Sequence, residues 1–155
     1  MSPCIATATR AAARRLTQLY DEVMAPSGLR VTQYHLLSEL ERRATEPPTV
    51  GELATILTIE RSALGQTLRP LERDGLVELH RDERDGRRRP IALTATGEKA
   101  VSAARPYWAQ AHDLFERYFG SAALAELRTT LRGIATDPDL PRAFGADSGH
   151  TGTNP

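Results

Sequence analysis

Apolar side chains recur at helical spacing along most of the chain, and this pattern predicts a mainly helical protein. The first stripe runs from residue 5 to residue 23, and "APSG" at 25–28 is expected to end that helix. Its members are Ile5, Thr9, Ala12, Leu16, Leu19, Tyr20 and Val23. A second helix is expected to start at Thr32, a good capping residue, and to stop at "TEPP", 45–48. Its apolar face holds Leu36, Leu37, Leu40 and Ala44.

Two further helices are predicted before the middle of the chain. Thr49 and Glu52 have the spacing of a capping box, in which each side chain accepts a hydrogen bond from a backbone N–H at a helix start. A longer helix is expected to begin at Thr58 and to end at Gly75, which is placed to be left-handed. Pro70 predicts a kink inside it, because proline removes a helical hydrogen bond. The buried stripe of this helix is Leu64, Thr67, Leu68 and Leu71.

The period changes over 76–93, where apolar and polar residues alternate as they do in strands. Val77 and Leu79 alternate with polar neighbours, and Ile91 and Leu93 do the same on the other side of an arginine-rich loop. The pattern predicts a two-stranded hairpin. Pro90 suits an edge position, because it has no N–H to donate to a ladder.

The remainder of the ordered chain is again helical in pattern. Thr94 or Thr96 is expected to cap a long helix, which Pro106 is expected to bend. Gly120 ends it and Ser121 is expected to cap a last helix. The two stripes are Val101, Ala104, Trp108, Ala111, Phe115, Tyr118 and Phe119, then Leu124, Leu127, Leu131 and Ile134.

Composition sets the broad class of the protein. The chain has 155 residues, of which 40% are hydrophobic and 26% charged, as expected for a soluble globular domain with a real core. No apolar run is long enough to span a bilayer and no signal peptide is recognisable, so a cytoplasmic protein is the simplest expectation. Pro, Gly, Asp, Ser and Thr dominate residues 137–155, which are expected to form a flexible tail.

The order of the predicted elements indicates a DNA-binding fold. A short helix, a turn, a longer helix and a hairpin together make a winged helix-turn-helix, in which the second helix enters the major groove. The polar face of that helix offers hydrogen-bonding and basic groups, whereas an ordinary solvated helix face is the alternative. The candidate base-reading residues are Arg61, Ser62, Gly65, Gln66 and Arg69.

The arginines of the hairpin loop favour a DNA-binding role for this loop over that of a plain solvated turn. Twenty basic residues balance twenty acidic ones, so the chain has no net charge and any DNA-binding surface has to be local. Arg84, Arg87, Arg88 and Arg89 stand against Asp85 alone in residues 84–89. Such a tip can follow the phosphate backbone and insert an arginine into the minor groove, with Asp85 as its brace.

These motifs resemble the MarR family of bacterial transcriptional regulators. The resemblance covers residues 5–136 and rests on "LERDGLVELHRDERDGRRRPIALTATGEKA" and on "GLRVTQYHLLSEL". Within the first stretch it is carried by Leu71-Glu72, Gly75-Leu76, Asp85-Gly86-Arg87, and Leu93-Thr94 with Gly97.

The resemblance implies a winged-helix homodimer, by default a repressor, on a pseudo-palindromic operator. Residues 5–30 and 95–136 would form the helical dimerisation region and residues 31–94 the DNA-binding domain. Arg87 would be the minor-groove arginine and Asp85 its partner.

The resemblance also implies two ways of releasing DNA. Many members bind small aromatic or phenolic effectors, and the candidate lining residues here, which are equally suited to core or dimer interface, are Leu16, Tyr20, Tyr34, His35, Trp108 and His112. One branch senses organic peroxides through a cysteine near the first helix. Cys4, the single cysteine, falls two residues early for that position, although Tyr20 matches a tyrosine of the branch. An incidental N-terminal cysteine is the alternative.

Other functions have less support in the sequence. The four histidines are scattered without metal-ligand spacing, so no metal or cofactor is predicted. No catalytic triad or phosphate-binding loop is recognisable, so an enzyme is not expected. The remaining alternative is a winged helix that binds a protein partner instead of DNA, which a wing poor in arginine would favour.

Overall fold

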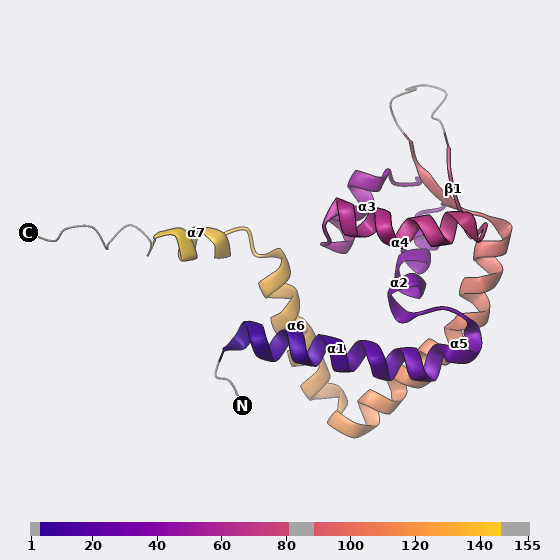
Figure 1. The fold of residues 1–155 in the computed structure, drawn as a ribbon. Helices are drawn as coiled ribbons and strands as arrows, with labels where there is room; N and C mark the ends of the chain where they lie inside the picture. Colours follow the sequence, from indigo (N-terminus) through magenta and orange to yellow (C-terminus); the bar gives the residue numbers. More distant parts are fainter. Residues whose placement is uncertain (1–3, 81–88, 147–155) are drawn as a thin grey trace, which may run out of the picture. The chain divides into compact units, whose positions relative to one another are not determined.

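The structure, a computed structural model, describes residues 4–80 and 89–146 and is mainly helical with one small hairpin (Figure 1). Its contacts divide the chain into two compact units, Met1–Phe115 and Glu116–Pro155. The elements in chain order are α1 (Ile5–Met24), the 3-10 turn η1 (Ala25–Ser27), α2 (Val31–Arg42), α3 (Val50–Leu57), α4 (Arg61–Arg73), β1 (Val77–Leu79), β2 (Ile91–Leu93), α5 (Ala95–Phe119), α6 (Ser121–Thr136) and α7 (Leu140–Ala146). The predicted fold class, mainly α with a β-hairpin wing, is confirmed.

The core of the first unit is built from the predicted leucine stripes. The stripes of α2, α3 and α4 bury their leucines against β1, β2 and α5 because each helix has one apolar face. The fully or nearly fully buried side chains include Leu36, Leu37, Leu40, Leu53, Leu64, Leu68, Leu71, Val77, Ile91, Val101 and Ala104. Ala44 was expected on the α2 face but is exposed, because α2 ends at Arg42.

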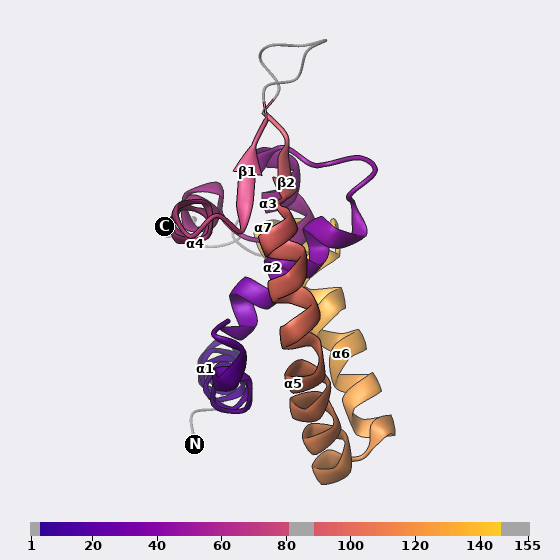
Figure 2. The ribbon, with the colours of Figure 1, turned by 90° about the vertical axis from the view of Figure 1, so that its right-hand side faces the viewer.

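The hairpin forms as predicted and gains one additional pairing. Val77 pairs with Leu93 and Leu79 with Ile91 in antiparallel register, and the two strands lie side by side in Figure 2. The Pro90 carbonyl oxygen accepts a hydrogen bond from His80 N (2.9 Å). Because proline has no N–H, it cannot donate a hydrogen bond in return, and the regular ladder ends there. A bridge between Thr49 and Pro90 ties the start of α3 to the hairpin. Pro90 was expected at an edge of the sheet, and it lies at the end of the strand ladder.

Helix α2 starts one residue before the predicted cap because its first N–H groups find other partners. Its N-cap is Arg30, not Thr32, which lies inside the helix. The Asp21 carboxylate of α1 accepts a hydrogen bond from Val31 N (2.7 Å), and Gln33 Oε1 accepts one from Arg30 N (3.0 Å). Since these acceptors satisfy the helix start, no threonine cap is required.

Two other predicted caps are also wrong. Thr58 closes α3 in a left-handed conformation (φ 54°), and α4 starts only at Arg61 with Glu60 as its N-cap. Ser121 is the first residue of α6, and the N-cap position belongs to Gly120. By contrast, the capping box of Thr49 and Glu52 and the left-handed Gly75 are confirmed.

The start of α5 packs closely against Leu76, which follows the turn at the end of α4. Thr94, rather than Thr96, caps it: its hydroxyl accepts from Gly97 N (3.0 Å) and donates to Gly75 O (2.6 Å). Gly97 is buried, and a Cβ placed there would lie 2.1 Å from the Leu76 carbonyl oxygen. The junction therefore depends on a residue without a side chain. Both interior prolines, Pro70 in α4 and Pro106 in α5, lie inside helices that continue through them.

In the second unit the apolar stripes are exposed in the single chain. No residue of α6 is buried, and the exposed apolar side chains of this unit include Tyr118, Phe119, Leu127, Leu131 and Ile134. The tail expected to be unstructured from residue 137 contains α7, Leu140–Ala146. Asp137 Oδ1 accepts from Asp139 N (2.9 Å) and so turns the chain into this helix, while residues 147–155 lie outside the described part.

A buried carboxylate near the end of α2 makes stability depend on pH. Glu39 is 4% exposed and accepts hydrogen bonds from Arg42 and from Arg43 Nε (2.8 Å). Burial raises the pKa of Glu39, but the hydrogen bond from Arg43 and the charges of both arginines outweigh it and lower the pKa. A lowered folded-state pKa means that the stabilisation is present above the unfolded-state pKa and is lost as pH falls through the folded one.

The Glu39→Gln variant should therefore lose about 1–3 kcal/mol of unfolding free energy at neutral pH, and its stability should fall less than that of the wild type on acidification below about pH 4.5. Urea unfolding at pH 7 and at pH 4 measures both effects. The exposed Glu46→Gln variant is the control. Parallel pH profiles for the Glu39 variant and the wild type would contradict this assignment.

Candidate DNA-binding surface

Helix α4 separates its apolar and polar residues cleanly onto two faces. Leu64, Leu68 and Leu71 are buried at 5% exposure or less. The predicted base-reading side chains Arg61, Ser62, Gln66 and Arg69 are all exposed on this helix. Gly65 is half-buried, and a Cβ there would meet nothing within 4 Å, so the surface beside it is open. The helix thus presents a polar face that the rest of the unit leaves uncovered.

Backbone hydrogen bonds hold α4 in place against the hairpin. Leu76 N donates to Leu71 O (2.9 Å) at the end of α4, and Ile91 N donates to Pro48 O (2.8 Å) just before α3. Helices α3 and α4 pack against each other, and α4 also contacts β1, as Figure 1 shows. Because both helices and the hairpin share these ties, the exposed face of α4 and the base of the wing keep a fixed relation.

The predicted wing residues are only partly described. Arg89 is exposed and lies two residues before β2. Arg84, Asp85, Arg87 and Arg88 lie outside the described residues, so the proposed brace between Asp85 and an arginine stays a prediction. At the base of the wing, Glu78 and His80 form an ion pair (2.9 Å) when the histidine is protonated.

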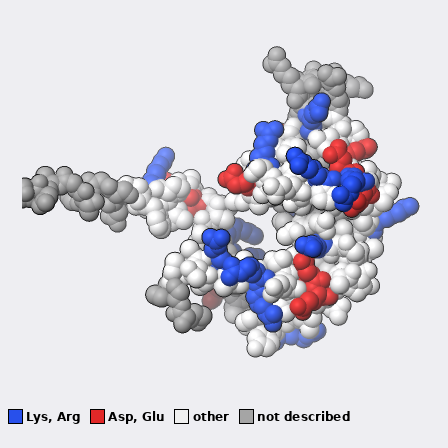
Figure 3. All heavy atoms as spheres, in the orientation of Figure 1, with Lys and Arg blue, Asp and Glu red and all other residues white. Residues whose placement is uncertain are grey.

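Basic and acidic side chains are both present around these elements. Figure 3 shows Lys and Arg side chains lying across the α3 and α4 region, with acidic groups among them. This agrees with a chain of zero formal net charge, in which a basic surface is local.

Four of the six candidate effector residues join one aromatic cluster. Trp108 stacks on His112 (ring centroids 5.4 Å apart, planes at 4°) and lies 5.9 Å from Tyr34. The Tyr20 hydroxyl lies 3.4 Å from His112 Nδ1, and its ring stacks on Phe115 at 5.3 Å. Sequence reasoning placed Phe115 in the helix stripe but did not include it in this group.

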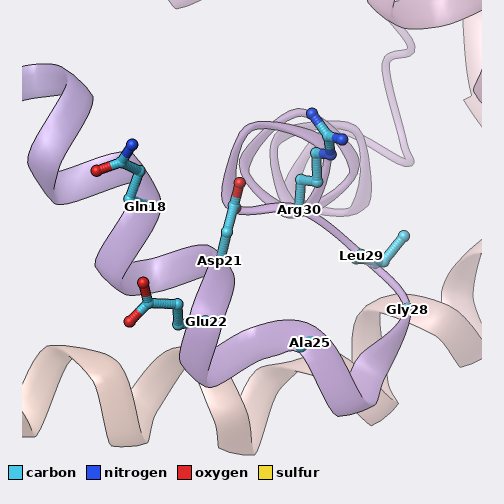
Figure 4. Close-up of a pocket in the computed structure, with 7 residues that line it drawn as sticks. All are labelled: Gln18, Asp21, Glu22, Ala25, Gly28, Leu29 and Arg30. Atoms are coloured by element: carbon cyan, nitrogen blue, oxygen red, sulfur yellow. The ribbon is translucent and has the colours of Figure 1, made fainter.

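The two remaining candidates do not take part in these ring contacts. Leu16 is half-buried and His35 is exposed. A hollow of about 650 Å³ lies where α1 turns into α2, lined by Gln18, Asp21, Glu22, Ala25, Gly28, Leu29 and Arg30 (Figure 4). None of the six candidates lines it.

Cys4 is exposed and is the N-cap of α1. Hydrogen bonds from the Thr7 backbone and side chain and from the Ala6 backbone lower the pKa of its thiol. The helix start therefore favours the thiolate, which is the reactive form. The groups that lower the pKa therefore all belong to the first turn of α1.

The described part of the chain holds neither a membrane-spanning helix nor a cluster of metal ligands. No helix there is long and apolar enough to cross a membrane. No group of three metal-ligating side chains comes together among the same residues.

Comparison with known proteins relates the chain to transcriptional regulators. A family model described as MarR family matches residues 27–88. The M. tuberculosis transcriptional regulator MosR is 30% identical, with 94% of this chain and 98% of that chain covered and a TM-score of 0.73. Its complex with DNA is 31% identical over 90% of this chain and 98% of that one, with a TM-score of 0.75.

A second solved structure has the same fold together with bound DNA. The transcriptional repressor CouR, bound to a 23-mer DNA duplex, is 26% identical over 86% of this chain and 93% of that one, with a TM-score of 0.76. A comparison with curated proteins gave no significant match.

Proposed function

The chain belongs to the MarR family, and from this premise we propose that it is a sequence-specific DNA-binding transcriptional repressor that works as a homodimer. The observation that carries the proposal is the two-faced helix α4, whose leucines are buried while Arg61, Gln66 and Arg69 stay exposed. A polar helix face beside a hairpin rich in arginine is the arrangement that reads a major groove. MosR and CouR, which share the fold, have been solved with DNA.

In this proposal each part of the surface has a separate task. Ser62 and Gln66 hydrogen-bond to base edges, Arg61 and Arg69 reach guanine or phosphate, and Gly65 allows the helix to come close. Arg84, Arg88 and Arg89 follow the backbone, and Arg87, braced by Asp85, enters the minor groove.

The exposed apolar residues of the second unit support a homodimer. Tyr118 is 82% exposed, Phe119 55% and Ile134 53%, although each belongs to a regular apolar stripe. Stripes of this size are rarely left in water by a monomer. In our proposal a second copy covers them, with residues 5–30 and 95–136 as the dimerisation region, 31–94 as the DNA-binding domain and a tail beyond residue 136. Two copies of α4 would then read a pseudo-palindromic operator.

Two release mechanisms are compatible with the geometry. A small aromatic effector would have to separate the rings of Tyr20, Tyr34, Trp108 and His112, because they pack against one another. Oxidation of Cys4 is favoured by its exposure and by the lowered pKa of its thiol.

A mobility-shift measurement with the DNA upstream of the protein's own gene tests this function. We expect the reduced protein to bind that DNA specifically. Under a thiol switch, mild organic peroxide should release the wild type but not the Cys4→Ser variant. If peroxide has no effect on either, Cys4 is incidental and small aromatic compounds become the effectors to test.

The absence of binding to that DNA and to a pool of random duplexes would contradict the proposal. In that event the winged helix would be better explained as a surface for a protein partner.

A further inference from the structure

One residue of the helix-turn-helix holds a backbone conformation that its side chain disfavours. Thr58, between α3 and α4, has φ 54° and ψ 46°. It is the single non-glycine residue with positive φ among the described residues, whereas the other positive-φ positions, 28, 75 and 120, are all glycine. A β-branched side chain is particularly unfavourable in the left-handed region. The chain therefore accepts strain at this turn that it avoids at its other positive-φ positions.

The turn itself needs the conformation but not the threonine. Thr58 N donates to Thr55 O (3.1 Å) and Ile59 N donates to Ala54 O (3.0 Å), which closes α3 in the way that glycine usually does. Glycine would make the same two hydrogen bonds without strain, because only backbone atoms take part. The side chain of Thr58 is thus not explained by the fold.

The Thr58 hydroxyl differs from other threonine hydroxyls in the described part of the chain. Other threonines, such as Thr55 and Thr67, donate to the carbonyl four residues earlier, and Thr49 and Thr94 cap helices. Thr58 is exposed and makes no side-chain hydrogen bond within the described residues. Unpaired surface hydroxyls are common, so the combination with a strained backbone is what distinguishes this residue.

The position of Thr58 explains what the hydroxyl is for. It lies at the entrance to α4, three residues before Arg61 and four before Ser62, on the side of the turn that faces solvent. We propose that the Thr58 hydroxyl donates a hydrogen bond to a phosphate oxygen of DNA and sets how far α4 enters the major groove. This inference rests on the proposed function and adds to it a contact that is independent of sequence, because phosphates carry no base identity.

Three substitutions separate the hydroxyl from the strain. Thr58→Gly removes both, Thr58→Ala removes the hydroxyl and keeps a Cβ in the left-handed region, and Thr58→Ser keeps the hydroxyl. The affinity of each dimer for its operator and for a duplex of unrelated sequence at low salt is measured by fluorescence anisotropy, and the melting temperature by thermal unfolding.

We expect Thr58→Gly to melt about 2–4 °C higher than the wild type, because the strain is relieved, and yet to bind both duplexes about tenfold more weakly. Thr58→Ala should lose affinity to the same extent while gaining less stability than Thr58→Gly, because it keeps a Cβ but loses the β-branch. Thr58→Ser should bind like the wild type. A purely structural residue would not lower affinity while raising the melting temperature.

The other outcomes overturn the proposal. If Thr58→Gly alone loses affinity, flexibility of the turn is the cause and not the hydroxyl. If all three variants bind like the wild type, the contact does not exist although the DNA-binding function stands. If the wild type binds neither duplex, the proposed function fails and this inference fails with it.

Discussion

The variant in which Arg84, Arg87, Arg88 and Arg89 are all replaced by alanine should bind its operator roughly 1,000-fold more weakly than the wild type at physiological salt. The chain has no net charge, so no broad positive field remains to hold DNA once the local arginines are gone. The slope of log affinity against log salt should become shallower by about 3, because fewer counterions are released. Arg87→Ala alone should account for a large share of the loss, since it is the arginine expected in the minor groove.

Fluorescence anisotropy over a range of salt concentrations measures both quantities. The matched control replaces three exposed arginines of α1, Arg10, Arg14 and Arg15, with alanine. Its affinity and its salt slope should stay close to those of the wild type. Equal losses in the two variants would indicate a general effect of charge, and an unchanged wing variant would contradict the assignment of the wing.

The Gly97→Ala variant should lose about 2–4 kcal/mol of unfolding free energy. The added Cβ would lie 2.1 Å from the Leu76 carbonyl oxygen and 2.9 Å from Leu93 Cδ2. The carbonyl cannot move aside easily, because it accepts a hydrogen bond from Thr94 N (3.1 Å) at the same junction. Relief of the clash therefore requires α5 to move away from the hairpin.

Urea unfolding monitored by circular dichroism tests this expectation. Gly133→Ala is the matched control, because it is also a helical glycine and a Cβ there meets nothing within 4 Å. That control should be neutral or gain up to about 1 kcal/mol from the higher helix propensity of alanine. If both variants unfold at the same urea concentration as the wild type, the close packing at Gly97 is not rigid.

The leucine stripes were predictable from sequence because burial repeats with the helical period. Leu36, Leu53, Leu64 and Leu71 are all in the core where their spacing placed them. The two strands of the hairpin were predictable for the same reason, from a period of two, whereas their register was not predicted.

The helix starts were less predictable, because a cap can be replaced by a distant partner. Thr32 is a good cap by type, but Asp21 from another helix satisfies the α2 start ten residues away in sequence. Thr58 precedes α4 as a cap should, yet it completes the preceding helix in a conformation that threonine seldom adopts. Neither the hydrogen bond from Val31 to Asp21 nor the left-handed conformation of Thr58 is visible in the local sequence pattern.

The two candidate sites also differ in how far the sequence predicts them. The exposed face of α4 follows from the period of its leucines, so Arg61, Gln66 and Arg69 could be chosen from sequence. The aromatic cluster joins α1, α2 and α5, and its ring contacts depend on tertiary packing. Trp108 belongs to the predicted apolar stripe but His112 does not, so the stacking of one on the other could not be predicted from that stripe.

That stacking gives the chain an optical probe of its own. Trp108 is the single tryptophan in the sequence, so all indole fluorescence comes from the centre of the aromatic cluster. Any molecule that separates these rings acts on the emitting group directly. Changes at the aromatic cluster can consequently be followed without a label, and separately from the proposed DNA-binding residues of α4 and the wing.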